Sequence, residues 1–204
     1  MNSFSIAILA GGMSKRFGSD KSFAMINGKT FIEILLENGK KLTDDIIIVT
    51  KNRDKFRFYD DVAIVEDLLP IQTPLLGILT GLYHARHDRV FISSVDSPLI
   101  KAEAIKIIIE SMESFDAVIP DIDGKIHPLI AAYNRSIFEK LNIFIEKGNL
   151  KVRDFLSELS IKYIKSDQFL MVDPDLASFK NFNTKDELEK YKIDIQLKNI
   201  SDDI

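Results

Sequence analysis

The chain has 204 residues, of which 46% are hydrophobic, and its 27 basic and 31 acidic side chains give a formal net charge of −4. This length predicts one domain, or a domain with a small lobe, and the acidic balance disfavours a nucleic-acid binder, which needs a basic face. The absence of cysteine excludes disulfides, thiolate metal sites and a cysteine nucleophile. No apolar run reaches the ~18 residues of a membrane span, and the amino terminus leaves no room for a signal peptide. We therefore expect a soluble, cytoplasmic protein without a membrane partner.

Apolar runs alternate with helical patterns along the whole chain. In chain order, the patterns predict a strand at 4–10, a helix at 30–42, strands at 46–50 and 62–66, a helix at 75–85, a strand at 89–95, a helix at 101–112, strands at 116–120 and 128–133, helices at 136–146 and 152–159, a strand at 161–164 and a helix at 184–191. Thr30 with Glu33, and Thr184 with Glu187, form capping boxes at two of the helix starts. This alternation predicts a three-layer α/β fold, in which a mostly parallel sheet is flanked by helices on both faces. We expect one domain over residues 1–192, followed by a polar tail over 193–204.

A glycine-rich loop follows the first predicted strand. Residues 9–21 read L-A-G-G-M-S-K-R-F-G-S-D-K, and ligands of parallel sheets bind at the carboxyl ends of the strands. The three glycines allow backbone N–H groups to approach a ligand closely. Because Lys15, Arg16 and Lys21 add positive charge, the loop predicts a triphosphate site; the alternative is an exposed turn with scattered basic residues.

Two other nucleotide-binding motifs are absent. The loop does not contain the Gly-x-Gly-x-x-Gly pattern of dinucleotide-binding folds. Asn27-Gly28-Lys29-Thr30 resembles the end of a P-loop, but Phe23 stands where its leading glycine would be. We interpret this segment as a turn that leads into the helix capped by Thr30, which disfavours a GTPase-type switch protein.

The loop at 9–21 resembles the signature L-A-G-G-x-S-x-R-x-G-x-D-K of the MobA family, the molybdenum cofactor guanylyltransferases. It is similar, more loosely, to the loop of the sugar-nucleotide and isoprenoid nucleotidyltransferases. Further along the chain, Asp67 closes a predicted strand, and Pro74-Leu75-Leu76-Gly77 resembles the family segment G-P-L-A-G. Thr73 stands where the family usually has glycine, and its Cβ disfavours a positive φ at that point.

A second group of matches carries the polar candidates. Asp96, in Val95-Asp96-Ser97-Pro98, resembles the aspartate of the family's C-D-x-P motif, which is a metal ligand. A carboxylate at a strand end is also well placed to hold Mg²⁺ against phosphates. Asn52 follows a strand and matches an Asn-Arg pair that the family has near guanine and phosphates.

The last matches concern the acceptor. His127 begins a segment resembling H-P-x-I-A-x-x-N-R, and it either contacts the acceptor phosphate or is a strand-edge histidine without a function. Asn181 and Asn183 lie in a segment resembling F-x-N-x-N-T. We expect them to alternate on a short strand, so that both amides face the acceptor or a metal-bound water; the alternative is helix capping near Thr184.

The resemblance covers about residues 6–192 and implies a Rossmann-like nucleotidyltransferase fold. It implies transfer of GMP from GTP to the terminal phosphate of molybdopterin, with Mg²⁺ as cofactor and molybdoenzyme-assembly proteins as candidate partners. The resemblance implies catalytic roles for Arg16, Lys21 and Asp96. It implies nucleotide binding by Leu9, Ala10, Gly11, Gly12, Lys21, Asn52, Asp67, Gly77 and Asp96. Three alternatives remain: a molybdopterin cytidylyltransferase, a sugar-phosphate nucleotidyltransferase, or a non-catalytic nucleotide-binding protein on the same fold.

Overall fold

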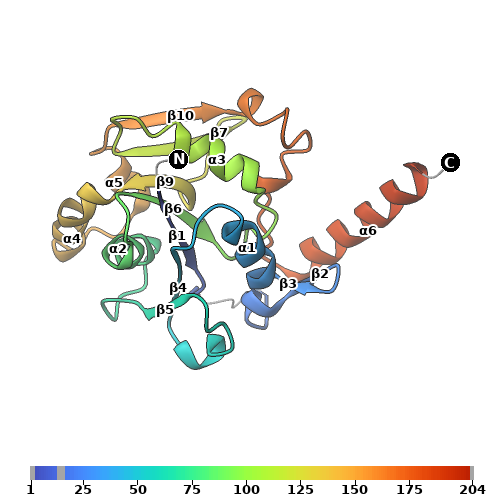
Figure 1. The fold of residues 1–204 in the computed structure, drawn as a ribbon, viewed down its shortest axis with the longest axis horizontal. Coiled ribbons are helices and arrows are strands. Elements are labelled where there is room, and N and C mark those ends of the chain that lie inside the picture. The colour runs from blue at the N-terminus through green and yellow to red at the C-terminus, as the bar shows by residue number, and fades with distance from the viewer. Residues whose placement is uncertain (1–2, 13–16, 203–204) are drawn as a thin grey trace.

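One open sheet organises the chain in the computed structural model, which describes residues 3–12 and 17–202 (Figure 1). The strands are β1 Ser5–Leu9, β2 Met25–Ile26, β3 Lys29–Thr30, β4 Ile46–Thr50, β5 Ala63–Glu66, β6 Arg89–Ser94, β7 Ala117–Ile122, β8 Lys125–Ile126, β9 Ile130–Asn134 and β10 Ile161–Lys165. The helices are α1 Phe31–Lys40, α2 Pro74–His84, α3 Ala102–Glu110, α4 Phe138–Glu146, α5 Val152–Leu156 and α6 Lys185–Asp202, with short 3-10 turns between them.

The strand order is β10-β7-β9-β6-β1-β4-β5, and β8 pairs with β7. β1 pairs in parallel with both β4 and β6, β4 with β5, and β7 with β10. β9 is antiparallel to its two neighbours, β6 and β7. The prediction of a three-layer fold around a mostly parallel sheet is therefore confirmed.

Alternate side chains of the central strands enter two separate core layers, because successive residues of a strand point to opposite faces. One layer joins the sheet to α1 and α3 through residues that include Ile6, Ile8, Ile46, Ile48 and Phe91. The other joins it to α2, α4 and α5 through Ala7, Ile47, Val49, Val90 and Ile92. The α2 layer is tight, since a Cβ on Gly81 would lie only 2.7 Å from the Ala7 Cβ.

The hairpin β2–β3 explains the Gly-Lys-Thr sequence that resembles a P-loop. Asn27 and Gly28, with φ of 49° and 81°, form its two-residue turn, as Asn-Gly pairs commonly do. Thr30 then caps α1 in a reciprocal capping box with Glu33. The predicted turn and helix start are both confirmed.

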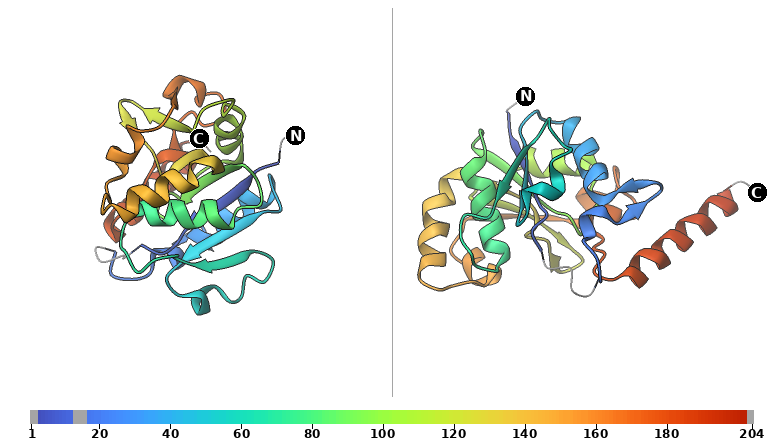
Figure 2. Two further views of the ribbon diagram at one scale, coloured as in Figure 1. Left: turned by 90° about the vertical axis from the view of Figure 1, so that its left-hand side faces the viewer. Right: turned by 90° about the horizontal axis from the view of Figure 1, so that it is seen from below.

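The carboxyl-terminal helix differs from its prediction. α6 begins where expected, with Thr184 and Glu187 forming the predicted capping bonds, but it continues to Asp202, past the predicted end at Tyr191. It projects from the rest of the molecule in Figure 1 and in the right-hand view of Figure 2. Ile193 and Leu197 of this helix are exposed, so its apolar residues do not form a buried stripe there, and the sequence pattern placed the end of the helix too early.

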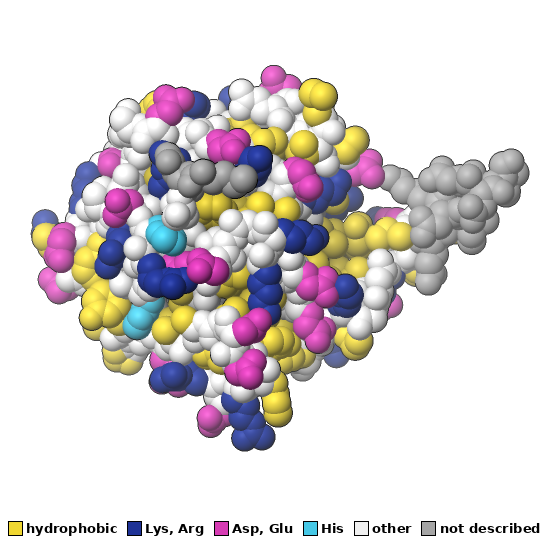
Figure 3. All heavy atoms as spheres, in the orientation of Figure 1, with side chains coloured by type: hydrophobic (Ala, Val, Ile, Leu, Met, Phe, Trp, Pro, Cys, Tyr) yellow, Lys and Arg dark blue, Asp and Glu magenta, His cyan; other side chains and the backbone are white. Residues whose placement is uncertain are grey.

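Charged side chains of both signs are interspersed over the face shown in Figure 3, where Lys and Arg do not form a continuous basic surface. Within residues 3–12 and 17–202, no helix is both long enough and apolar enough to cross a membrane.

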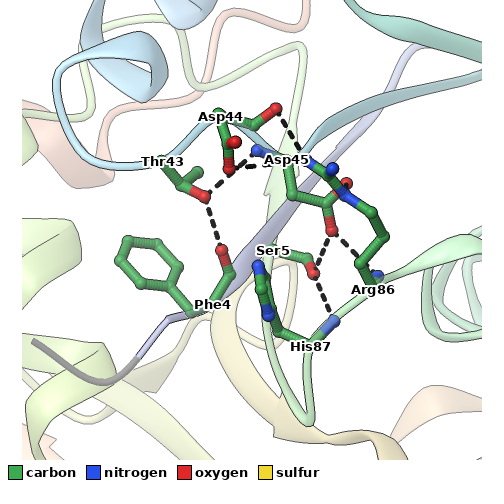
Figure 4. A network of polar contacts seen from close by, with 7 residues as sticks. All are labelled: Phe4, Ser5, Thr43, Asp44, Asp45, Arg86 and His87. Atoms are coloured by element: carbon green, nitrogen blue, oxygen red, sulfur yellow. Dashed lines mark hydrogen bonds and ion pairs between the residues drawn. The ribbon is translucent and has the colours of Figure 1, made fainter.

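A polar network joins the amino ends of β1, β4 and β6 (Figure 4). Asp45, 5% exposed, precedes β4 and accepts hydrogen bonds from Ser5 Oγ at 2.5 Å, Arg86 N at 2.9 Å and Arg86 Nε at 2.8 Å. The His87 N–H donates to Ser5 Oγ at 3.1 Å. One buried carboxylate thus links the starts of three strands, at the edge of the sheet opposite their carboxyl ends.

Replacing Asp45 by asparagine is expected to lower the free energy of unfolding by about 1.5–3 kcal/mol, the range for hydrogen bonds to a charged group. One carboxylate oxygen would become an NH₂ facing hydrogen-bond donors. Burial by itself would raise the pKa of Asp45, but the bonds from Ser5 and Arg86 bring it below the ordinary 3.8. This stabilisation is complete above the unfolded-state pKa and is lost as the pH falls through the folded-state pKa.

Urea unfolding of both proteins at pH 7 and in strong acid measures the effect. The difference in stability should shrink as the pH falls. A difference that is the same at both values would contradict the role given to the Asp45 charge.

Candidate active site

Polar residues follow four neighbouring strands at the carboxyl edge of the sheet. Gly11 and Gly12 come after β1, Lys51 after β4, Asp67 after β5 and Asp96 after β6. All five line one hollow of ≈ 300 Å³. The fold therefore brings together residues that are far apart along the chain, at the carboxyl ends of the strands where parallel sheets bind their ligands.

Two further hollows adjoin the first and share the glycine loop. One, of ≈ 510 Å³, is lined by residues that include Gly11, Gly12, Asp20, Asn52 and Lys55. The other, of ≈ 190 Å³, is lined by Gly12, Lys21, Ser22 and Asp96, among others. Lys51 and Lys55 line the second hollow, whereas Lys21 and Asp96 line the third.

Gly11 and Gly12 have ordinary negative or extended φ, unlike Gly18, whose φ is 74°. A Cβ on Gly12 would meet no described atom within 4 Å, and one on Gly11 would lie 3.4 Å from Asp67 Oδ2 and from Lys51 Cγ. Neither backbone strain nor a described neighbour therefore requires glycine at position 12. A side chain at this position would enter open space beside the three hollows that Gly12 lines.

Leu9 and Ala10 connect this loop to the sheet. The Leu9 carbonyl accepts a hydrogen bond from Val95 N at 3.1 Å, and the Ala10 N–H donates to the Val49 carbonyl at 2.8 Å. The Ala10 N–H is therefore used within the protein, so that Gly11 and Gly12 are the better candidates for backbone contact with a ligand.

Asp96, 24% exposed, and Lys21, 13% exposed, lie face to face, with 3.9 Å between Asp96 Oδ2 and Lys21 Nζ. Lys21 Nζ also donates to Asn183 Oδ1 at 3.2 Å. Ser97 Oγ donates to Asn181 Oδ1 at 2.6 Å, and the Phe182 N–H donates to the Asp96 carbonyl at 2.8 Å. Three segments of the chain therefore meet at Asp96.

The segment with the two asparagines is not the strand that we predicted. Residues 180–183 form no strand, and the Phe182 N–H donates to the Asp96 carbonyl. Both amides nevertheless reach the same small region, where Asn183 accepts from Lys21 and Asn181 accepts from Ser97.

Lys21 is the first residue of a short 3-10 turn, Lys21–Phe23, which Asp20 caps by accepting from Ser22 N at 3.1 Å. Asp20 also accepts from Lys55 Nζ at 2.7 Å. Burial alone would raise the pKa of Asp20, but Lys55 and Ser22 hold it below its ordinary value. The ionised Asp20 thus holds the turn from which Lys21 projects.

The start of α2 forms the wall of the first hollow. Thr73 caps the helix with its side chain and has φ of −152°, so the glycine usual in the family is not needed for backbone reasons. A Cβ on Gly77 would lie 3.0 Å from Leu9 Cδ1. Gly77 therefore allows α2 to pack closely against the end of β1.

Asp67 and Lys51 face each other across Gly11. Burial raises the pKa of Asp67, and the Lys51 ammonium partly opposes that rise. Lys51 was not among the residues chosen from the sequence, although it lines two of the hollows. The strand-end rule would have found it, because it directly follows β4.

The remaining candidates lie less centrally. Asn52 Oδ1 accepts from Asp54 N at 3.0 Å and so caps a 3-10 turn beside the second hollow. His127 is 6% exposed and packs on Phe179, with 5.4 Å between ring centroids. Burial, with Lys125 in support and Asp121 in opposition, lowers the pKa of His127 to about 4, so that it is neutral at pH 7.

His127 lines none of the three hollows, and Arg16 lies outside the described residues. In the part of the chain that the structure describes, no group of three or more His, Asp or Glu side chains could hold a metal ion. A metal at Asp96 would therefore have fewer than three such ligands among the described residues, with amide oxygens, water or substrate phosphates as the others.

Comparisons with known proteins agree with this geometry. A family model described as a MobA-like NTP transferase domain matches residues 6–162. A molybdenum cofactor guanylyltransferase of Desulfosudis oleivorans is 36% identical, over 95% of this chain and 96% of its own length. A probable molybdenum cofactor guanylyltransferase of Natranaerobius thermophilus is 35% identical, over 91% and 93%. The crystal structure of molybdopterin-guanine dinucleotide biosynthesis protein A from Archaeoglobus fulgidus superimposes with a TM-score of 0.83 at 27% identity, over 94% of this chain and 98% of the other.

Proposed function

Since this chain belongs to the MobA-like family of NTP transferases, which includes the molybdenum cofactor guanylyltransferases, we propose that it transfers GMP from GTP to the terminal phosphate of molybdopterin. The products are molybdopterin guanine dinucleotide and pyrophosphate. The observation that carries the proposal is the meeting of Lys21, Asp96, Asn181 and Asn183 beside the glycine loop.

The acceptor phosphate oxygen attacks the α-phosphorus of GTP in line, and pyrophosphate leaves. A phosphate monoester is already largely ionised near pH 7, so no general base is required. The protein then acts by positioning the two substrates and by stabilising charge. Lys21 supplies a cation that Asn183 and Asp96 hold in place, and the N–H groups of Gly11 and Gly12 face the phosphates. The family resemblance adds Arg16.

The donor set suits Mg²⁺, with Asp96 as its ligand. Mg²⁺ is commonly held by one or two carboxylates together with substrate phosphates and water. Asp96 is a partly exposed carboxylate at the edge of a hollow, with the amide oxygens of Asn181 and Asn183 nearby. When bound, the ion would offset the repulsion between the two anionic substrates and the charge that develops on pyrophosphate.

The nucleoside fits the first hollow, between Asp67, Gly77 and the loop. We assign Asp67 to the ribose or the metal, and residues 9–12 to base selection together with Asn52, which lines the adjoining second hollow. We also propose that the reaction takes place in the cytoplasm and that molybdoenzyme-assembly proteins are partners of the chain.

GTP is expected to be preferred over CTP and ATP. Guanine offers N1–H and an amino group as donors and O6 as an acceptor, so the other bases would leave buried polar groups unpaired. Each such group costs about 1–3 kcal/mol, or roughly tenfold to a hundredfold in specificity. Competition among the three nucleotides, with molybdopterin as acceptor, measures kcat/KM for each and also tests whether turnover occurs.

A preference for CTP would assign the chain to the cytidylyltransferases and leave the role of Asp96 standing. Equal use of all three nucleotides would show that the loop binds phosphates only, and would remove residues 9–12 and Asn52 from base selection.

A further inference from the structure

A buried carboxylate outside the reaction site holds the segment that carries the two asparagines. Asp173 is 1% exposed, and its Oδ2 accepts from Ser178 N at 2.8 Å. Its Oδ1 lies 3.0 Å from Lys101 Nζ. Lys101 directly precedes α3; its N–H donates to Ser178 Oγ at 3.1 Å, and its Nζ donates to the Val172 carbonyl at 3.0 Å. Residues 172–178 are thus tied to the start of α3 at several points.

The two segments that meet at Asp173 both continue to the reaction site. On one side, Lys101 follows the loop that begins with Asp96 and Ser97. On the other side, Ser178 precedes Asn181 and Asn183 by a few residues. The two segments of the chain meet again at the reaction site. There Ser97 Oγ donates a hydrogen bond to Asn181 Oδ1, and the Phe182 N–H donates one to the Asp96 carbonyl. Asp173 therefore closes a small structural unit whose other end is the reaction site.

The segment is held in a conformation that it would not readily adopt alone. Leu176 has φ of 48°, in the left-handed region that side-chain-bearing residues rarely occupy. Its N–H donates to the Asp173 carbonyl at 2.9 Å. Phe179, which follows, packs on Phe169 with 4.8 Å between ring centroids and on His127. Losing the Asp173 contacts would free this turn to relax and shift the chain beyond it.

We propose that Asp173 is a positioning residue of the transfer reaction, which sets Asn181 and Asn183 against Ser97 and Lys21 without touching a substrate. This rests on the proposed function. In the same arrangement, His127 supports the segment by packing against Phe179, which precedes the two asparagines.

The variant Asp173→Asn tests the proposal, because the amide keeps the shape but loses the charge opposite Lys101 and turns one acceptor into a donor. We expect kcat/KM for molybdopterin to fall roughly a hundredfold, as a small displacement of reacting groups can cause. The Kd for GTP, measured by calorimetry without acceptor, should stay within about threefold, because neither Asp173 nor the two asparagines line the first hollow, and Lys21 is expected to act on the transition state more than on GTP binding.

Hydrogen exchange supplies a readout that does not depend on activity. In Asp173→Asn, the amides of residues 177–183, Phe182 above all, should exchange at least about tenfold faster at temperatures where the rest of the protein stays protected. Should that variant not fold, Lys101→Met removes the same charge pair from a side chain that is 41% exposed, and the same two results are expected.

Asp45→Asn is the matched control, since it also alters a buried, hydrogen-bonded carboxylate, but at the opposite edge of the sheet. It should lower stability without changing kcat/KM or the exchange of residues 177–183. Equal losses of activity in the two variants, or unchanged exchange of residues 177–183 in Asp173→Asn, would overturn the proposal. If the unaltered protein forms no dinucleotide, the proposed function fails, whereas the exchange measurement still decides the role of Asp173.

Discussion

Replacing Asp96 by asparagine is expected to lower kcat by roughly a hundredfold to a thousandfold, the range found when a group that stabilises transition-state charge is removed. The amide keeps the shape of the carboxylate but loses the charge that would hold Mg²⁺ and that faces Lys21 at 3.9 Å. The hydrogen bond that Phe182 makes is unaffected, because it goes to the Asp96 backbone carbonyl. The fold should therefore survive the change.

Turnover and thermal unfolding of the variant should be measured together. Asp61→Asn is a suitable control, since Asp61 is an exposed carboxylate that pairs with Lys40 on the surface. Activity of Asp96→Asn within a few-fold of the unaltered protein would remove Asp96 from the role of metal ligand.

Replacing Lys21 by alanine is expected to lower kcat more than it raises KM for GTP. The Lys21 side chain is only 13% exposed, and a charge shielded from water acts more strongly on nearby phosphates. A cation that interacts best with the developing charge lowers the barrier itself, whereas one that binds substrate and transition state equally changes only KM. We expect a loss of roughly a hundredfold in kcat.

Lys29→Ala is the matched control for this variant. Lys29 pairs with Glu37 on the surface, is 53% exposed and lines none of the three hollows. Its loss should change kcat little. An unchanged kcat with a raised KM in Lys21→Ala would show that Lys21 only anchors the bound nucleotide.

The sheet and the first part of the site could be predicted from the sequence because they depend on local patterns. Short apolar runs predicted the strands of the main sheet other than β8. The position of ligands at the carboxyl ends of parallel strands then selected the glycine loop, Asp67 and Asp96, which line one hollow. The resemblance to the MobA family, stated from motifs in their order, is confirmed by the family model. The apolar patterns and the family motifs both consist of residues that are close together along the chain, so the sequence alone contains them.

The rest depends on contacts between distant segments, which no local pattern contains. Asn183 meets Lys21, and Asn181 meets Ser97, only because the chain returns after β10. Nothing in the sequence around Asp173 distinguishes it from the other aspartates. Its role depends on contacts with Lys101 and Ser178 in the folded chain. The low pKa of His127 likewise follows from burial, which the sequence does not reveal.

The most direct test of the account is to incubate the unaltered protein with molybdopterin, GTP and Mg²⁺, and to identify the products by mass. We predict a molybdopterin guanine dinucleotide that forms together with one pyrophosphate for each GTP consumed. Release of inorganic phosphate and GDP instead of pyrophosphate, or the absence of a dinucleotide with GTP and with CTP, would contradict the proposed transfer.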